Sequence, residues 1–192
     1  DVPLLKTAVE QIAALNAQYG PASNGEPRFF LFHRKRLWNE AQQKWLAWER
    51  KRGKLHEFNR LLRGASNTSF ITLDGRQPHA PAGIRFVITL DSDTRLPLGA
   101  VRQLVGTAAH PQNRPRLHPD TQQVIEGYGI LQPRITPLLP NSRDTSVFQR
   151  IFSGPSGIDP YAGAVSNIYQ DVFGAGSYTG KGIYDVDAFE AS

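Results

Sequence analysis

Apolar and polar residues alternate at helical spacing in some segments of the chain and at strand spacing in others. Residues 3–18 repeat apolar side chains every three to four positions, which predicts an amphipathic helix. Residues 28–33 form a short aromatic and aliphatic run that predicts a strand. Residues 38–62 return to helical spacing. Because glycine weakens a helix, we expect a turn or kink at Gly53 and a second helix beginning near Lys54.

The second half of the chain alternates strand-like and helix-like segments. Residues 84–90 are nearly all apolar and β-branched, which is typical of a buried parallel strand. A helix over 97–109 follows, opened by its proline, and a further strand is predicted over 124–131. Helices are predicted over 145–152 and 161–173. The alternation predicts an α/β fold with a mostly parallel sheet.

The amino-acid composition indicates a globular domain and excludes several kinds of site. The chain has 192 residues, 40% hydrophobic and 20% charged, as in a globular domain. No apolar run is long enough to span a bilayer as a helix. The absence of cysteine excludes disulfides, thiolate metal sites and a cysteine nucleophile. Because methionine is also absent, even at the start, we expect the chain to be an excised piece of a longer protein.

Positive charge is concentrated in one segment. Residues 28–63 carry 11 Lys and Arg against 3 acidic residues, within a chain whose net charge is +5. Such a segment is either a solvated helix face or a site for a polyanion. Nucleic acid is not the expected partner, because zinc-finger spacing, leucine heptads and the RNA-binding aromatic signature are all missing.

The strongest candidate for chemistry is Asp91-Ser92-Asp93, at the end of the strand 84–90. In an open α/β sheet, ligands bind at the carboxyl ends of the strands. Two carboxylates there can face a hard divalent cation whose other ligands are phosphate oxygens and waters. The alternative is a structural turn in which an aspartate caps the following helix.

Three further stretches suit ligands. The cationic cluster 49–55, beside a glycine and a helix start, offers N–H groups and charge to a phosphate, or is simply a basic helix surface. Loops 153–161 and 174–187 are rich in Gly, Tyr and Asp, which suits a sugar-binding groove or an ordinary connection. A Walker-type loop, a histidine metal site and a serine-hydrolase elbow are excluded, because their patterns are absent.

Taken together, the chain resembles the glycosyltransferase domain of cyclic β-1,2-glucan synthases. The resembling segments, from about residue 28 to the end, are 29–39, 48–62, 85–97, 126–134, 148–161 and 176–190. The wider pattern is similar to processive, inverting GT-A glycosyltransferases. The resemblance implies a GT-A-like α/β fold, a mostly parallel sheet flanked by helices. Residues 1–192 would form a single partial domain, its central part, lacking the first strands and the segment with the catalytic base.

The resemblance also implies roles for individual residues on the donor side. Asp91 and Asp93 would hold Mg²⁺ or Mn²⁺ against the diphosphate of UDP-glucose, with the metal as Lewis acid for the departing UDP. Lys54 would lie near the donor phosphates, assisted by Arg50 and Arg52. Asp91, Asp93 and Lys54 are therefore the expected catalytic residues.

On the acceptor side, the resemblance implies a set of residues that would contact the growing glucan: Gln132, Arg134, Tyr178, Lys181, Asp185 and Asp187. Synthesis in this family would be primed on the protein itself. Tyr161 is the expected primer, with Tyr169, Tyr178 and Tyr184 as rivals.

The implied function is transfer of glucose from UDP-glucose to a growing β-1,2-glucan, with inversion. The expected partners are UDP-glucose, the glucan and the rest of the parent polypeptide, and an oligomer remains open. The chain itself is expected to be soluble and inactive alone, as part of a multi-pass protein at the cytoplasmic side of a bacterial inner membrane. Two alternatives stay open: a non-catalytic carbohydrate-binding or scaffolding module, and a polyanion-binding domain using residues 28–63.

Overall fold

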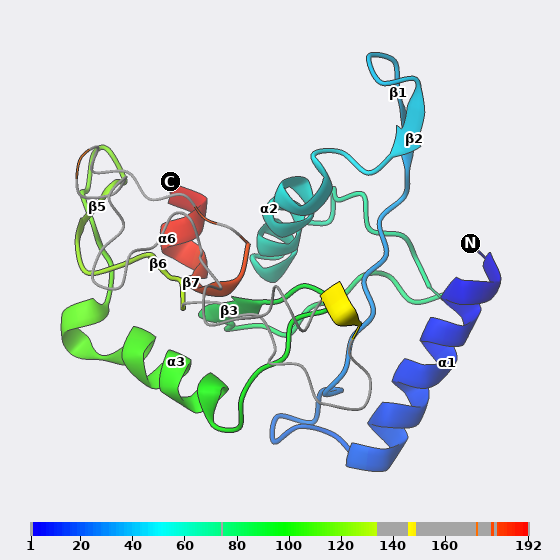
Figure 1. Cartoon of the computed structure of the whole chain (residues 1–192), viewed down its shortest axis with the longest axis horizontal. Helices are drawn as coiled ribbons and strands as arrows, with labels where there is room; N and C mark the ends of the chain where they lie inside the picture. Colours follow the sequence, from blue (N-terminus) through cyan, green and yellow to red (C-terminus); the bar gives the residue numbers. More distant parts are fainter. Residues whose placement is uncertain are drawn as a thin grey trace. The chain divides into compact units, whose positions relative to one another are not determined.

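The computed structural model describes residues 2–73, 75–133, 146–148, 172, 178 and 180–191 (Figure 1). The chain divides into two compact units, Asp1–Arg85 (unit 1) and Phe86–Ser192 (unit 2). The described part is a mixed α/β structure with small antiparallel sheets. Within these ranges, no helix combines the length and the hydropathy needed to cross a bilayer.

Unit 1 contains two helices and a β-hairpin. Its elements are α1 (Val2–Tyr19), β1 (Leu37–Asn39), β2 (Lys44–Leu46) and α2 (Arg50–Leu62). Helix α1 confirms the amphipathic helix expected over 3–18, but none of its residues is buried. The helix is tied to the following segment through Asn16, whose Oδ1 accepts from the backbone N–H groups of Arg28 and Phe29, both at 3.0 Å.

The strand expected over 28–33 is wrong. The segment has no ladder, and only an isolated bridge joins Arg34 to Phe70. Its aromatic residues pack instead around Phe32, whose ring lies 5.5 Å from the rings of both Phe58 and Phe70. The apolar run therefore packs against the core of unit 1 and does not form a sheet.

The prediction of a long helix over residues 38–62 is also wrong for its first half. Residues 37–46 form the antiparallel hairpin β1–β2, in which Trp38 pairs with Trp45 at a ring distance of 5.7 Å. A spacing of seven residues puts two side chains on one helix face, but it also pairs them across a hairpin with a short loop. The sequence pattern could not separate these two cases.

Helix α2 is continuous through Gly53, so the predicted interruption there is wrong as well. A Cβ at Gly53 would lie 2.3 Å from the carbonyl oxygen of Trp48 and 2.6 Å from its indole. The glycine is needed because Trp48 approaches the first turn of the helix closely, not because the helix breaks.

Unit 2 is built on a small sheet with short flanking helices. Its elements in chain order are β3 (Phe86–Thr89), α3 (Ala100–Ala109), the 3₁₀ turn η1 (Pro111–Asn113), β4 (Arg116–Leu117), β5 (Val124–Glu126), β6 (Ile130–Leu131), β7 (Gly182–Asp185) and α6 (Val186–Ala191). Helix α3 begins three residues later than expected. The strand predicted over 124–131 is divided into β5 and β6 at Gly127, whose φ is +71°.

The sheet order is β3-β7-β6, and both pairings are antiparallel. Val87 and Ile130 both face Tyr184 of the central strand β7, which is buried at every position. The expected parallel pairing is absent among the described strands. A continuous apolar run indicates a strand buried on both faces, but it does not give the direction of its neighbour.

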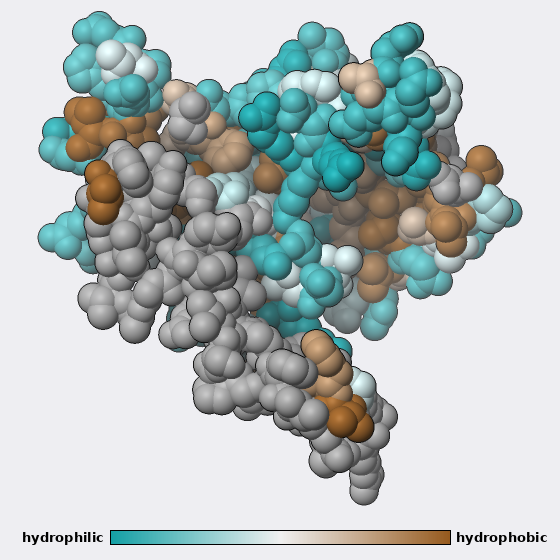
Figure 2. Space-filling view, turned by 45° about the horizontal axis from the view of Figure 1, so that its top comes forward, coloured by the Kyte–Doolittle hydropathy of each residue, from teal (hydrophilic) through white to brown (hydrophobic). Residues whose placement is uncertain are grey.

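The core of unit 2 lies on β7 and the helix after it: Ile183, Tyr184, Val186 and Ala188 are at most 2% exposed. Outside these cores, hydrophobic side chains remain at the surface, and Figure 2 shows them in brown among hydrophilic atoms on one face. The helices predicted over 145–152 and 161–173 lie largely outside the described residues.

Candidate functional site

The first candidate site lies in unit 2, where β3 ends. Asp91 follows the strand by two residues, and its backbone carbonyl accepts from Thr94 N–H at 3.0 Å, which closes the turn. Its carboxylate Oδ2 is 3.2 Å from the ammonium of Lys181, which immediately precedes β7. The antiparallel pairing of β3 with β7 brings these two residues together from 90 positions apart. Two residues of the predicted site therefore meet in the structure.

Tyr178 belongs to the same cluster. Its hydroxyl is hydrogen-bonded to Thr89, the last residue of β3, and its ring packs edge-on against Tyr184 and Phe189. Burial and the nearby Asp91 carboxylate raise the pKa of Tyr178, although the hydrogen bond from Thr89 lowers it in part. The tyrosine is therefore neutral at physiological pH and can donate a hydrogen bond.

A pocket of about 470 Å³ opens beside this strand end. Gln132 and Lys181, both predicted to bind the acceptor, line it together. Thr94 and Arg95 add further polar groups, and Leu104 of α3 is among the apolar residues that form its walls. A mostly apolar pocket with a few polar groups in its lining is the usual form of a small-molecule site.

Asp91 is partly exposed and Asp93 is exposed, and neither carboxylate lines the pocket; their oxygen atoms are of the kind that a hard divalent cation prefers. Mg²⁺ is commonly bound by one or two protein carboxylates, with phosphate oxygens and waters completing the shell. Asp91 already faces the ammonium of Lys181 at 3.2 Å, so a metal ion would have to displace this ammonium from the carboxylate. In the described part of the chain, no group of three His, Asp or Glu side chains is placed to hold a metal ion. Substrate oxygens would therefore have to complete such a site.

The other residues predicted to contact the acceptor lie in different environments. Asp185 is buried in β7, and its Oδ1 accepts from the N–H groups of Asp187 and Ala188 at 3.1 and 3.3 Å, which caps α6. Asp187 is exposed. Arg134 and the expected primer Tyr161 lie outside the described residues, as does Tyr169. The roles of all these residues in binding stay predictions.

The cations predicted to bind the donor lie in unit 1, on the first turns of α2. The helix begins at Arg50, so Lys54 is on its second turn and not at its start. Arg50, Arg52 and Lys54 are exposed, and Arg52 Nε lies 3.1 Å from Glu49 Oε2. The first turn of α2 carries no acidic residue, so these cations add to the positive end of the helix dipole, but Glu49 directly before the helix balances Arg52.

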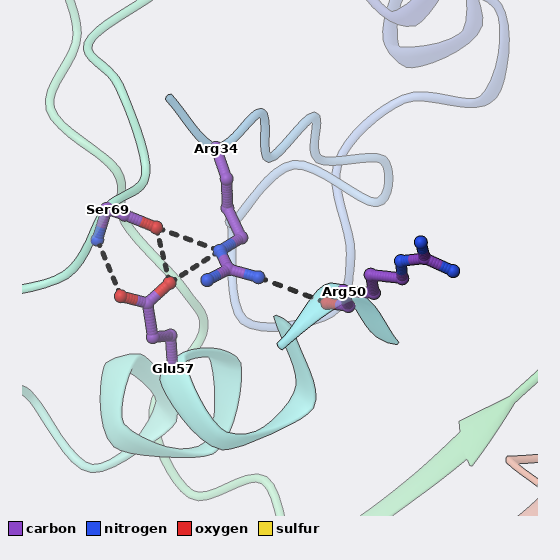
Figure 3. A network of polar contacts seen from close by, with 4 residues as sticks. All are labelled: Arg34, Arg50, Glu57 and Ser69. Carbon is purple, nitrogen blue, oxygen red and sulfur yellow. Dashed lines mark hydrogen bonds and ion pairs between the residues drawn. The ribbon is translucent and has the colours of Figure 1, made fainter. Parts of the chain in front are cut away.

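A buried network holds this end of α2 in place (Figure 3). Arg34 is 5% exposed. Its Nε lies 2.6 Å from Glu57 Oε2 and 2.8 Å from Ser69 Oγ, and its Nη1 donates to the Arg50 carbonyl at 3.1 Å. The side chain of Arg50 points away from the network in Figure 3. No sequence pattern predicts this arrangement, because its bonded pairs are 12 to 35 positions apart.

The network also changes the acidity of Glu57. Burial by itself would raise the pKa of this carboxyl group. The hydrogen bonds from Ser69 and the charge and hydrogen bond of Arg34 outweigh burial, so the pKa is held below its ordinary value. Glu57 is therefore ionised at neutral pH and balances the buried guanidinium of Arg34.

Comparison with known proteins confirms the resemblance inferred from the sequence. The chain is 55% identical over all of its 192 residues to cyclic beta-(1,2)-glucan synthase NdvB of Rhizobium meliloti (strain 1021). The chain spans 7% of the length of that protein. No family model matches the chain.

Proposed function

Because the chain is homologous along its whole length to a segment of a cyclic β-1,2-glucan synthase, we propose that it is part of the glucosyltransferase machinery of such an enzyme. In this proposal the complete protein transfers glucose from UDP-glucose to a growing β-1,2-glucan, with inversion, and its catalytic domain is of the GT-A type. The strand end at Asp91 is the donor site.

The observation that carries the proposal is the group of charged and polar residues where β3 ends. Asp91 is paired with Lys181 at 3.2 Å, and Lys181 lines the pocket of about 470 Å³ together with Gln132 and Arg95. A carboxylate suits a bound cation, and the two cationic side chains suit phosphate oxygens. A nucleoside diphosphate sugar with a bound divalent metal needs a carboxylate for the metal and cationic side chains for the phosphates.

In the proposed mechanism Asp91 and Asp93 hold Mg²⁺ or Mn²⁺. The metal supplies Lewis-acid neutralisation of the charge that develops on the leaving UDP. Lys181 pairs with Asp91 before the donor binds and contributes its positive charge to the phosphates afterwards. Gln132, whose amide both donates and accepts hydrogen bonds, orients hydroxyl groups of the bound sugar from the pocket wall.

The test is glucosyl transfer by the intact synthase carrying Asp91→Asn or Asp93→Asn. Metal-assisted charge stabilisation is worth several kcal/mol, so we expect each variant to lose at least about 100-fold in transfer rate. Asp120→Asn is the matched control, because Asp120 is an exposed carboxylate in a turn of the same unit, outside the site. Undiminished transfer by Asp91→Asn and Asp93→Asn would remove the metal role from the proposal.

A further inference from the structure

A second pocket lies entirely within unit 1, between the hairpin β1–β2 and the start of α2. Its volume is about 370 Å³. It is lined by a compact set of mostly polar side chains around one indole: Asn39, Gln42, Leu46, Trp48, Glu49 and Arg50. Of these residues only Arg50 was among the predicted donor contacts, so the pocket itself has no assigned role.

The chemistry of this lining matches a ring that carries several hydroxyl groups. Each hydroxyl donates one hydrogen bond and accepts others, so a site for it needs donors and acceptors side by side. The amides of Asn39 and Gln42 supply both, Glu49 accepts and Arg50 donates. Trp48 is half-exposed and gives a flat apolar surface on which the C–H face of a sugar ring can lie.

We propose that this pocket binds a glucosyl unit of a glucan chain. An isolated anion fits it less well, because Glu49 is part of the lining. An apolar peptide fits it less well too, because four of the six lining residues are polar or charged. The saccharide class follows from the lining, and the choice of a β-1,2-linked glucan rests on the proposed function.

The surrounding structure holds one side of the lining, residues 48–50, before any ligand binds. Glu49 and Arg50 have φ values of 50° and 46°, a left-handed conformation that non-glycine residues rarely adopt. The Arg50 carbonyl is held at 3.1 Å by the buried Arg34 (Figure 3). Trp48 is seated against Gly53 and meets the His56 ring edge-on at 6.0 Å. Rigid support of this kind lowers the entropy lost on binding.

The test uses the full chain in ¹H–¹⁵N spectra, without metal or nucleotide. The chain has three tryptophans, so three indole N–H signals are expected, and Trp38→Phe, Trp45→Phe and Trp48→Phe assign them. Titration with a β-1,2-linked glucotetraose should move the Trp48 signal until it saturates. The Trp45 signal should stay in place, because Trp45 is more exposed than Trp48 but does not line the pocket.

Two variants probe the polar lining without removing the indole. Gln42→Ala keeps the backbone N–H that bonds to Asn39 Oδ1 at 2.9 Å, and Glu49→Gln keeps the shape of the side chain. Loss of one hydrogen bond costs about 1 kcal/mol, so each should weaken binding about fivefold. Trp45→Phe is the control and should bind as the unchanged chain does.

Three results would overturn the saccharide pocket. These are a Trp48 signal that moves with neither the β-1,2-linked glucotetraose nor cellotetraose, equal movement of all three indole signals, and movement by UDP but by neither tetraose. Cellotetraose, a β-1,4-linked tetraose, separates this proposal from the proposed function. If cellotetraose moves the Trp48 signal and the β-1,2-linked tetraose does not, the saccharide pocket is upheld and the β-1,2-glucan assignment is contradicted.

Discussion

The two units each contain an ion pair close to their candidate site, and the two pairs differ in burial. In unit 1 the side chains of Arg34 and Glu57 are 2% and 14% exposed and lie 2.6 Å apart. In unit 2 the side chains of Lys181 and Asp91 are 28% and 38% exposed and lie 3.2 Å apart. Separating the first pair leaves a buried charge, whereas separating the second exposes both charges to water.

Because they differ in burial, the two ion pairs have different roles. The buried pair joins α2 to two loop segments and stabilises the fold of unit 1. In the more exposed pair, Lys181 lines a pocket, so a ligand bound there can compete with Asp91 for the ammonium group. Ion pairs at a site are therefore informative about binding when they are accessible, and about folding when they are not.

The most direct test of this comparison removes the cationic side chain from each pair and measures the loss of stability. Arg34→Met should destabilise unit 1 by about 3–5 kcal/mol, because Glu57 is left without its cation in a buried place. Lys181→Met should change the stability of unit 2 by less than about 1 kcal/mol.

Urea unfolding measures both effects. Fluorescence reports unit 1 alone, because all three tryptophans lie in it, and amide exchange of β7 reports unit 2. Arg52→Met is the control for unit 1, since its pair with Glu49 is exposed, and it should cost less than about 1 kcal/mol. Equal costs for Arg34→Met and Lys181→Met would show that burial does not distinguish the two pairs.

A smaller effect is expected from two helical glycines, one in each unit. Gly53→Ala should destabilise α2 by about 1–3 kcal/mol, because the new methyl group would meet the Trp48 carbonyl at 2.3 Å. Gly106→Ala in α3 meets nothing within 4 Å and should stabilise by about 0.5–1 kcal/mol through helix propensity alone. The same urea and exchange measurements apply. Stabilisation by Gly53→Ala would mean that Trp48 is not packed on the helix.

The smallest effect is the pH dependence that Glu57 adds to unit 1. Its pKa is lower in the folded chain than in the unfolded chain, so the unfolded state takes up the proton first as the pH falls. The contribution is full above the ordinary carboxyl pKa and is lost as the pH falls through the folded pKa. Urea midpoints from pH 7 to pH 3 should therefore depend less on pH in Glu57→Gln than in the unchanged chain. Glu40→Gln, at an exposed hairpin position, should keep the full slope.

The sequence predicted the elements whose pattern is local and missed those set by distant partners. Helix α1 and the strand at Phe86–Thr89 were predicted because their periodicity is strong over consecutive residues. The hairpin was missed because the seven-residue spacing of Trp38 and Trp45 suits a helix equally well. Direction in the sheet was missed because β7 lies more than 90 residues beyond β3, and no local pattern encodes that pairing.

For the candidate site, the position of Asp91 after a strand was predictable and its partner was not. Lys181 was expected on the acceptor side from resemblance, yet it pairs directly with Asp91. The burial of Arg34 was not predicted, because the sequence does not show which of the 11 basic residues in segment 28–63 is buried. Contacts of this kind depend on packing, which single-residue patterns do not encode.

The central claim, that Asp91 and Asp93 form a cation site completed by a nucleotide, is tested most directly by titrating the chain with Mn²⁺ and following free Mn²⁺ by electron paramagnetic resonance. We expect Mn²⁺ to bind more tightly when UDP-glucose is present. Asp91→Asn and Asp93→Asn should each weaken that binding at least about tenfold, because each removes a direct ligand. Mn²⁺ binding that ignores UDP-glucose, or that survives in the doubly substituted chain, would contradict the account.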